Sequence, residues 1–300
     1  MTSVPLSLLD LASVEESGDI AAALRHSVDL ARAAETFGYR RVWYAEHHNM
    51  SAIASSATAV LIAHVAANTT RIRLGAGGIM LPNHSPLVIA EQFGTLAELH
   101  PGRIDLGLGR APGSDMAAFR ALRRSPAAAE NFPTDVRELQ QLLSDELPRT
   151  AVNAYPGRGT RVPLFILGSS MFGASVAAQF GLPYAFASHF APQLLRSAVQ
   201  HYRDHYVPSP EHPEPYVIAG INVVAAESDA QAEALFTRTE FARVRRFLSR
   251  GRETELTDAE TAAVFDSPAA VQIREMLTHT AVGGRERVAQ ELAAFAAYAH

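Results

Sequence analysis

The chain has 300 residues, a formal net charge of −5 and no cysteine. Its length suits one α/β barrel, and its 48% of hydrophobic residues are enough for a large core. The missing cysteines exclude disulfides, thiolate metal sites and cysteine nucleophiles. No apolar run is long enough to span a membrane, no signal peptide is visible, and no block of basic residues marks a surface for nucleic acid. We therefore expect a cytoplasmic protein that binds neither membranes nor nucleic acid.

Strand-like and helix-like segments alternate along the chain at intervals of roughly thirty residues. Runs rich in aromatic and β-branched residues predict the strands, and apolar residues at a spacing of about 3.6 predict the helices. The predicted strands are residues 4–10, 41–48, 71–81, 103–110, 162–167, 182–188 and 216–225. The predicted helices are residues 20–37, 55–68, 85–99, 172–180, 192–206 and 229–250.

This alternation predicts an α/β protein with a parallel sheet. Because no dinucleotide-binding fingerprint follows the first strand, we expect a (β/α)₈ TIM barrel rather than a doubly wound sheet, in a single domain over residues 1–300. Two segments interrupt the alternation and are expected as insertions on the active face. Residues 111–161 hold five prolines around one predicted helix at 135–143, and residues 251–281 are irregular and suited to a lid.

The stretch at 41–48, RVWYAEHH, carries the strongest chemical signal. It begins with strand-type residues and ends in Glu46, His47 and His48. Ligands of parallel α/β folds bind at the carboxyl ends of the strands, so these three side chains are candidate active-site residues. The alternative is a partly buried histidine pair with ordinary hydrogen-bond partners at the end of a strand.

Three weaker signals lie in or near other predicted strands. Gly77-Gly78 either presents bare backbone to a flat ligand or marks a β-bulge. Arg110 ends a strand, where a guanidinium suits a phosphate or a carboxylate; the alternative is an ordinary surface arginine. Ser169 and Ser170 stand between a strand and a helix, where hydroxyl and N–H groups either bind an anion or cap the helix.

Five motifs resemble those of the bacterial luciferase-like monooxygenase family, in the same order and from about residue 4 to the end. They are AEHH at 45–48, GAGGIMLPNHSP at 75–86, PGRIDLGLGRAPG at 101–113, ILGSSMFGA at 166–174 and GLPYAFASHF at 181–190. The pattern favours the single-chain relatives that emit no light. One difference is Gly109, which stands where luciferases have a reactive cysteine.

The resemblance implies roles for the residues at 46–48. Glu46 matches a family residue near the flavin ring. His47 matches the histidine that acts as the catalytic acid/base in luciferases, and His48 is its neighbour. An imidazole suits this work because it titrates near neutral pH.

The resemblance also implies contacts to a flavin. Gly77-Gly78 matches a peptide bond that is cis in this family without a proline. Arg110 matches an arginine that meets the FMN phosphate. Ser169 and Ser170 fall on the phosphate-binding loop.

The family implies a flavin-dependent monooxygenase in which reduced FMN and O₂ oxygenate a small organic substrate. Because no nicotinamide fingerprint is visible, reduced FMN would come from a separate flavin reductase. The family also implies a homodimer, which we expect to form through the helix at 55–68. The residues that select the substrate would lie in the two insertions, where no motif identifies it.

Three alternatives remain open. One is a deazaflavin-dependent hydride-transfer oxidoreductase on the same barrel, and another is a non-catalytic flavoprotein that stores FMN. The third is a metal hydrolase with Glu46 and His48 as ligands two residues apart on a strand. It needs further ligands, which only His84 and His189 offer. We expect no metal.

Residues 282–300 predict a final helix, with Val288, Leu292, Phe295 and Ala296 on one stripe. In the family such a helix precedes the eighth strand of the barrel and a closing helix. We therefore expect the eighth strand to be missing from this chain and the natural protein to be longer.

Overall fold

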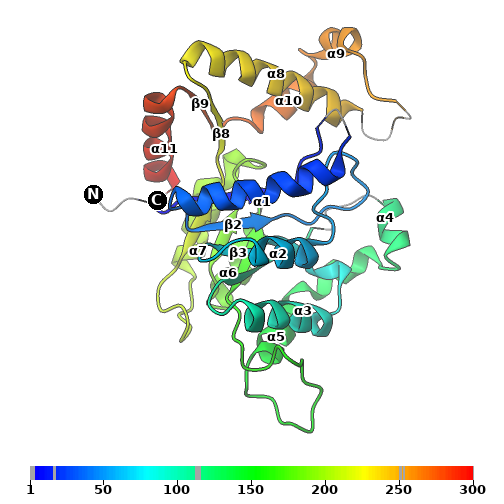
Figure 1. Ribbon diagram of the computed structural model, residues 1–300, viewed down its shortest axis with the longest axis vertical. Helices are drawn as coiled ribbons and strands as arrows, with labels where there is room; N and C mark the ends of the chain where they lie inside the picture. Colours follow the sequence, from blue (N-terminus) through cyan, green and yellow to red (C-terminus); the bar gives the residue numbers. More distant parts are fainter. Residues whose placement is uncertain (1–3, 16–17, 112–115, 250–251, 253, 300) are drawn as a thin grey trace. The chain divides into compact units, whose positions relative to one another are not determined.

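A computed structural model describes residues 4–15, 18–111, 116–249, 252 and 254–299 (Figure 1). The chain forms two compact units. The first is Met1–Gly168 with Phe180–Pro183, and the second is Ser169–Gln179 with Tyr184–His300. Each unit has its own strands and helices.

Five parallel strands run through the first unit, and they pair in the order in which they occur in the chain. They are β1 (Ser7–Asp10), β2 (Arg41–Tyr44), β3 (Arg73–Met80), β4 (Ile104–Gly109) and β5 (Leu164–Gly168). The register pairs Trp43 with Gly75, and Gly75 with Asp105. Since all five strands run the same way, residues that follow different strands come together at one edge.

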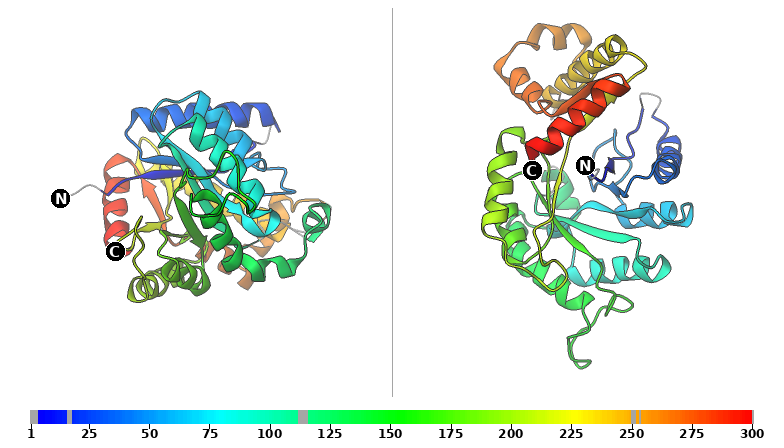
Figure 2. Two further views of the ribbon diagram at one scale, coloured as in Figure 1. Left: turned by 90° about the horizontal axis from the view of Figure 1, so that it is seen from below. Right: turned by 90° about the vertical axis from the view of Figure 1, so that its left-hand side faces the viewer.

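The helices of the first unit cover its strands (Figure 2). They are α1 (Ile20–Thr36), α2 (Thr58–Ala67), α3 (Pro86–Leu99), α4 (Met116–Ala121) and α5 (Phe132–Leu143), with 3₁₀ turns η1 (Leu81–Asn83) and η2 (Pro126–Asn131). The first helix shows why such segments form. The Asp19 side chain accepts the N–H of Ala22 at 2.8 Å, and Gly38 has a φ of +77° just beyond the last turn.

A buried ionic cluster joins the amino-terminal halves of β2, β3 and β4. The Asp105 carboxylate is fully buried, and it binds the guanidinium of Arg73. It also lies 3.5 Å from Nε of Arg41 and accepts from Nε1 of Trp43 at 3.2 Å. Such donors compensate a buried carboxylate for its lost hydration. The cluster therefore fixes three strands whose opposite ends carry candidate site residues.

In the second unit, β6 (Tyr184–Phe186) pairs in parallel with β7 (Val217–Ala219), and β8 (Asn222–Ala225) with β9 (Thr280–Gly283). The helices are α6 (Met171–Gln179), η3 (Pro192–Leu194), α7 (Leu195–Asp204), α8 (Asp229–Leu248), α9 (Asp258–Val264), α10 (Pro268–Glu275) and α11 (Arg285–Ala299). Val244, Ala270 and Ile273 form a small buried core where α8 meets α10.

The predicted α/β class and the parallel pairing in chain order are confirmed. Two strands differ from their predicted bounds. β2 ends at Tyr44, so Glu46 and the histidines follow the strand rather than end it. The strand predicted at 216–225 is interrupted at Gly220, whose N–H donates to the carbonyl of Phe186 at 3.0 Å. A Cβ at Gly220 would lie 2.5 Å from Nδ1 of His189, so the backbone at Gly220 lies close against the His189 ring.

The two predicted insertions contain more regular structure than expected. In the first, α4 was not predicted, and α5 begins before residue 135 because Pro133 fits the first turn of a helix. The second contains α9, α10 and the start of β9. The final helix therefore begins at Arg285, after a strand that the sequence did not predict. The stripe predicted on this helix is half-buried.

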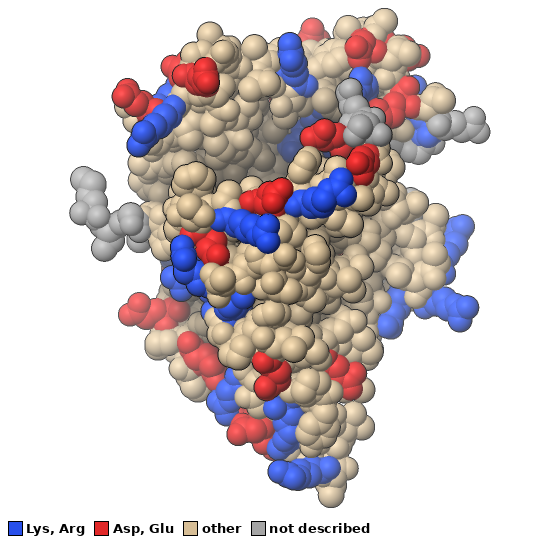
Figure 3. Space-filling model, in the orientation of Figure 1, with Lys and Arg blue, Asp and Glu red and all other residues tan. Residues whose placement is uncertain are grey.

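Charges of both signs are interspersed over the face that carries α1 (Figure 3). Arg25 pairs with Asp19, and Arg32 lies 4.0 Å from Asp29. Within the described residues, every helix is too short or too polar to cross a membrane.

Candidate active site

Glu46 lies two residues beyond β2, and only 1% of it is exposed. Its carboxylate accepts from Nε2 of His48 at 2.8 Å and from Nε2 of His84 at 2.9 and 3.0 Å. It also accepts from the backbone N–H of Met80 at 2.9 Å and from Nδ2 of Asn83 at 3.3 Å. The carboxylate therefore joins the end of β2 to the end of β3 and the turn that follows it.

These donors decide the charge of Glu46. Burial by itself raises the pKa of this carboxyl, but the hydrogen bonds from His48, His84 and Met80 outweigh it and lower the pKa to about 2. The carboxylate is therefore ionised at neutral pH. An ionised carboxylate accepts hydrogen bonds and donates none, so both histidines donate to it.

The hydrogen bond to Glu46 raises the pKa of His48 above its ordinary value, although burial opposes the change. His48 therefore keeps its proton to higher pH than a free imidazole. The side chains of His48 and His84 are 21% and 27% exposed, so one side of each ring remains accessible. A buried anion that holds two accessible imidazoles is suited to store and deliver protons.

The structure brings together Glu46 and His48, which the sequence predicted, with His84, which it considered only as a metal ligand. His84 follows η1, the turn after β3, and reaches Glu46 across a separation of 38 residues. The sequence signal that could have identified His84 as a site residue is its position shortly after β3, the strand that pairs with β2. His47 is half-buried and lies between Glu46 and His48 in the chain.

Gly77-Gly78 lies inside β3, and its peptide bond is cis, as the family resemblance implied. The pairing of β3 with β4 shifts register between Ala76 and Ile79, so the strand is irregular at the place where the alternative expected a bulge. A Cβ at Gly77 would lie 2.9 Å from Cβ of Trp43, and one at Gly78 would lie 2.7 Å from the carbonyl oxygen of Gly107. Packing between strands therefore explains both glycines without a ligand.

The remaining predicted residues also lie where strands end. Arg110 is exposed and follows β4 in the first unit. Ser169 and Ser170 stand between β5 and α6 and belong to the second unit; Ser169 is half-buried and Ser170 is exposed. The carbonyl of Ser170 accepts from the hydroxyl of Tyr184 at 3.0 Å.

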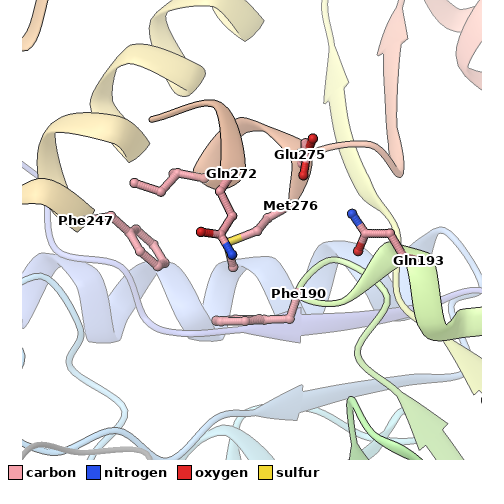
Figure 4. A pocket seen from close by; sticks show the side chains of 7 residues that line it. Phe190, Gln193, Phe247, Gln272, Glu275 and Met276 are labelled. Carbon is pink, nitrogen blue, oxygen red and sulfur yellow. The ribbon is translucent and has the colours of Figure 1, made fainter. Parts of the chain in front are cut away.

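The second unit contains a cavity of about 480 Å³ (Figure 4). This volume lies in the usual range for small-molecule sites. Aromatic, aliphatic and thioether groups from three segments face it, together with two amides and one carboxylate. The lining residues are Phe190, Gln193, Phe247, Gln272, Ile273, Glu275 and Met276. Four of them come from the predicted insertion at 251–281.

Among the described residues, no group of three or more His, Cys, Asp or Glu side chains has the arrangement of a metal site. Glu46 has histidine and amide donors around it. His189 belongs to the second unit, where its ring packs against Phe190.

Comparison with known proteins identifies the class to which this chain belongs. The chain matches the family model for luciferase-like monooxygenases over residues 6–299. It is 50% identical to a luciferase-like monooxygenase of Escherichia coli (strain K12), over 95% of this chain and 86% of that protein. It is 34% identical to N-acetyl-S-alkylcysteine monooxygenase of Bacillus subtilis (strain 168), over 96% and 88%.

The crystal structure of apo-MsnO8 matches this chain with a TM-score of 0.84 and 35% identity, over 99% of this chain and 89% of that one. This chain belongs to the luciferase-like monooxygenase family. It is an enzyme.

Proposed function

We propose that this enzyme uses reduced FMN and O₂ to oxygenate a small organic substrate, and that a separate flavin reductase supplies the reduced FMN. The observation that carries the proposal is the buried, ionised Glu46 with His48 and His84 at the ends of parallel strands, in a chain of the luciferase-like monooxygenase family. This arrangement supplies proton donors and acceptors at the edge where such folds bind ligands.

The residues present fit a flavin that carries a phosphate. Arg110 offers an exposed guanidinium after β4, and Ser169 and Ser170 offer hydroxyls before α6. Each would contact the phosphate, since cationic and hydroxyl donors suit it. The backbone at Gly77 is partly exposed and would face the ring with Gly78. When bound, the flavin supplies the activation of O₂, and the protein supplies binding, orientation and protons.

We assign proton transfer to His47, with Glu46 and His48 beside it. His47 follows Glu46 directly in the chain and is half-buried, so its ring is accessible to a ligand. Glu46 orients the rings of His48 and His84 through hydrogen bonds beside the ends of β2 and β3. We further propose that the strands form a barrel of the (β/α)₈ type, in a single domain that works as a homodimer in the cytoplasm.

The cavity of the second unit is the candidate substrate site of this proposal. Phe190, Phe247 and Met276 would pack against an apolar body, and Gln272 would hydrogen-bond to one polar group. Among the described residues, the lining contains a carboxylate, Glu275, and no basic side chain. It therefore favours a neutral or cationic substrate over an anionic one.

A deazaflavin enzyme is the second candidate. At 14% identity the same fold occurs in a Baeyer–Villiger monooxygenase in complex with FMN, with a TM-score of 0.68, and in an F420-dependent secondary alcohol dehydrogenase, with a TM-score of 0.69. The fold thus accommodates both cofactors and does not choose between them. Membership of an enzyme family disfavours a protein that only stores FMN.

Titration of the purified protein with FMN, reduced FMN and F420 tests the proposal. We expect reduced FMN to bind most tightly and the complex to consume O₂. Tight binding of F420 with weak binding of both FMN forms would contradict the monooxygenase proposal and support the hydride-transfer enzyme instead.

A further inference from the structure

Glu46 receives four hydrogen-bond donors, and three of them lie within reach of Oε1. Oε1 lies 2.8 Å from Nε2 of His48, 2.9 Å from Nε2 of His84 and 3.3 Å from Nδ2 of Asn83. Oε2 lies 3.0 Å from the same nitrogen of His84 and 2.9 Å from the backbone nitrogen of Met80. One carboxylate oxygen offers about two lone-pair sites, so the three donors at Oε1 must share them.

The shared acceptor fixes the tautomer of both rings. Because Glu46 is ionised and only accepts, His48 and His84 each carry a hydrogen on Nε2. Nδ1 is then the nitrogen of each ring that is left open to proton exchange. In both residues the ring is partly exposed, so this exchange needs no unfolding.

We infer that His84 is a positioning residue, which competes with His48 for Oε1 of Glu46 and so limits how firmly Glu46 holds the proton of His48. A carboxylate shared between two imidazoles stabilises each imidazolium less than a carboxylate that serves one alone. Without His84, His48 keeps its proton to higher pH. The competition follows from the contacts of Glu46, whereas its use in turnover rests on the proposed function.

Three charged side chains act on His48 and His84 or belong to the elements beside them. Glu46 is the charged group that acts on His48. Arg124 donates to the carbonyl of Asn83, next to His84, at 3.2 Å. Asp135 lies on α5, which packs against η1, and burial and the charge of Glu138 raise its pKa, while Arg124 opposes the rise. The variants proposed below leave all three unchanged.

Two substitutions at His84 separate the hydrogen bond from the rest of the ring. In His84→Gln the side-chain amide nitrogen takes the place of Nε2 and still donates to Glu46, but it does not titrate. In His84→Asn the side chain is too short to reach Glu46. His64→Gln is the matched control, since His64 is exposed on α2, away from Glu46.

The experiment is long-range ¹H–¹⁵N NMR of the imidazole rings against pH, on protein without flavin. We expect the Nε2–H tautomer for neutral His48 and His84, a higher titration midpoint of His48 in His84→Asn, and an unchanged midpoint in His84→Gln and His64→Gln. An unchanged midpoint in His84→Asn would overturn the inference. An equal rise of the His48 midpoint in His84→Asn and His84→Gln would also overturn it. The cause would then be the loss of the imidazole charge, which both variants share, and not the loss of the hydrogen bond. If His84→Asn does not fold, His84→Ala removes the same donor.

The pH dependence of turnover with reduced FMN then tests the catalytic role. If the proposed function is correct, the acid limb of the profile moves to higher pH in His84→Asn and stays in place in His84→Gln. Failure of all variants and of the unchanged protein to consume O₂ would refute the proposed function, while the NMR midpoints would still decide the competition at Glu46.

Discussion

Replacing Glu46 with glutamine tests the centre of the site. Glutamine has nearly the same shape, but it has no charge and turns one acceptor oxygen into a donor. The neighbours of Glu46 all donate to it: two imidazoles, one side-chain amide and one backbone N–H. At least one donor would therefore face another donor in a buried place, which costs about 1–3 kcal/mol.

The pKa of Glu46 provides a second estimate of the magnitude. It falls from an ordinary 4.5 to about 2 in the folded chain. At about 1.4 kcal/mol per unit this corresponds to roughly 3 kcal/mol of stability. Because the folded pKa is lowered, the contribution is complete above pH 4.5 and is lost as the pH falls toward 2.

His48 contributes with the opposite sign. Its folded pKa is raised, so its contribution is complete below the ordinary value of 6.5 and is lost as the pH rises through the folded value. We therefore expect Glu46→Gln to lower the free energy of unfolding by roughly 3 kcal/mol between about pH 5 and pH 6. The loss should be smaller on both sides of this window.

Urea denaturation measures this difference, with the fluorescence of Trp43 as the signal, because Trp43 is the single tryptophan of the chain and is buried. Glu35→Gln is the matched control. Burial raises the pKa of Glu35, but donors that include Arg71 and Ile72 outweigh it and lower the pKa to about 2, without a histidine partner. The loss of unfolding free energy in Glu35→Gln should therefore become smaller only at low pH. A difference for Glu46→Gln that stays constant from about pH 4 to pH 9 would refute the reasoning.

Three further changes test the proposed function. His47→Ala should keep the fold and lower turnover by roughly 100-fold or more, as expected for a lost acid/base, and unchanged turnover would remove this role. Arg110→Ala should weaken FMN binding by about 1.5–3 kcal/mol in calorimetry and leave riboflavin binding nearly unchanged; equal losses would show that Arg110 does not bind the phosphate. Val60→Arg should dissociate the proposed homodimer, because Val60 is 70% exposed on α2. A variant that still sediments as a dimer would place the interface elsewhere.

The sequence predicted the strands and longer helices because each has a local signal. Burial on both faces makes β2 apolar after Arg41, and the spacing of Val28, Ala31 and Ala34 marks the inner face of α1. The four residues of β9 and the six of α4 are too short for any period to appear. Whether the strands close into a barrel, and whether the chain is one domain, are still predictions.

The site was predicted only as far as its signals are local. Glu46 and His48 are two residues apart, so their proximity could be predicted from the sequence. The approach of His84 depends on the direction in which the turn at Leu81–Asn83 points the chain, and no pattern of residue types specifies that direction. A polar residue in the first turn after a strand is therefore a candidate site residue whenever the neighbouring strand ends in a charged group.

The glycines of β3 show how the same sequence signal changes meaning once the packing is known. As a cluster inside a strand, they suggested close approach of a ligand. In the structure, a Cβ at Gly75 would lie 2.9 Å from Nε1 of Trp43, and one at Gly77 would lie 2.9 Å from its Cβ. The glycines therefore make room for the indole, whose Nε1 donates to Asp105 and whose ring packs edge-on against Phe165. Since core packing already requires these glycines, they do not count as independent support for a flavin, and Arg110 is the more discriminating residue to test.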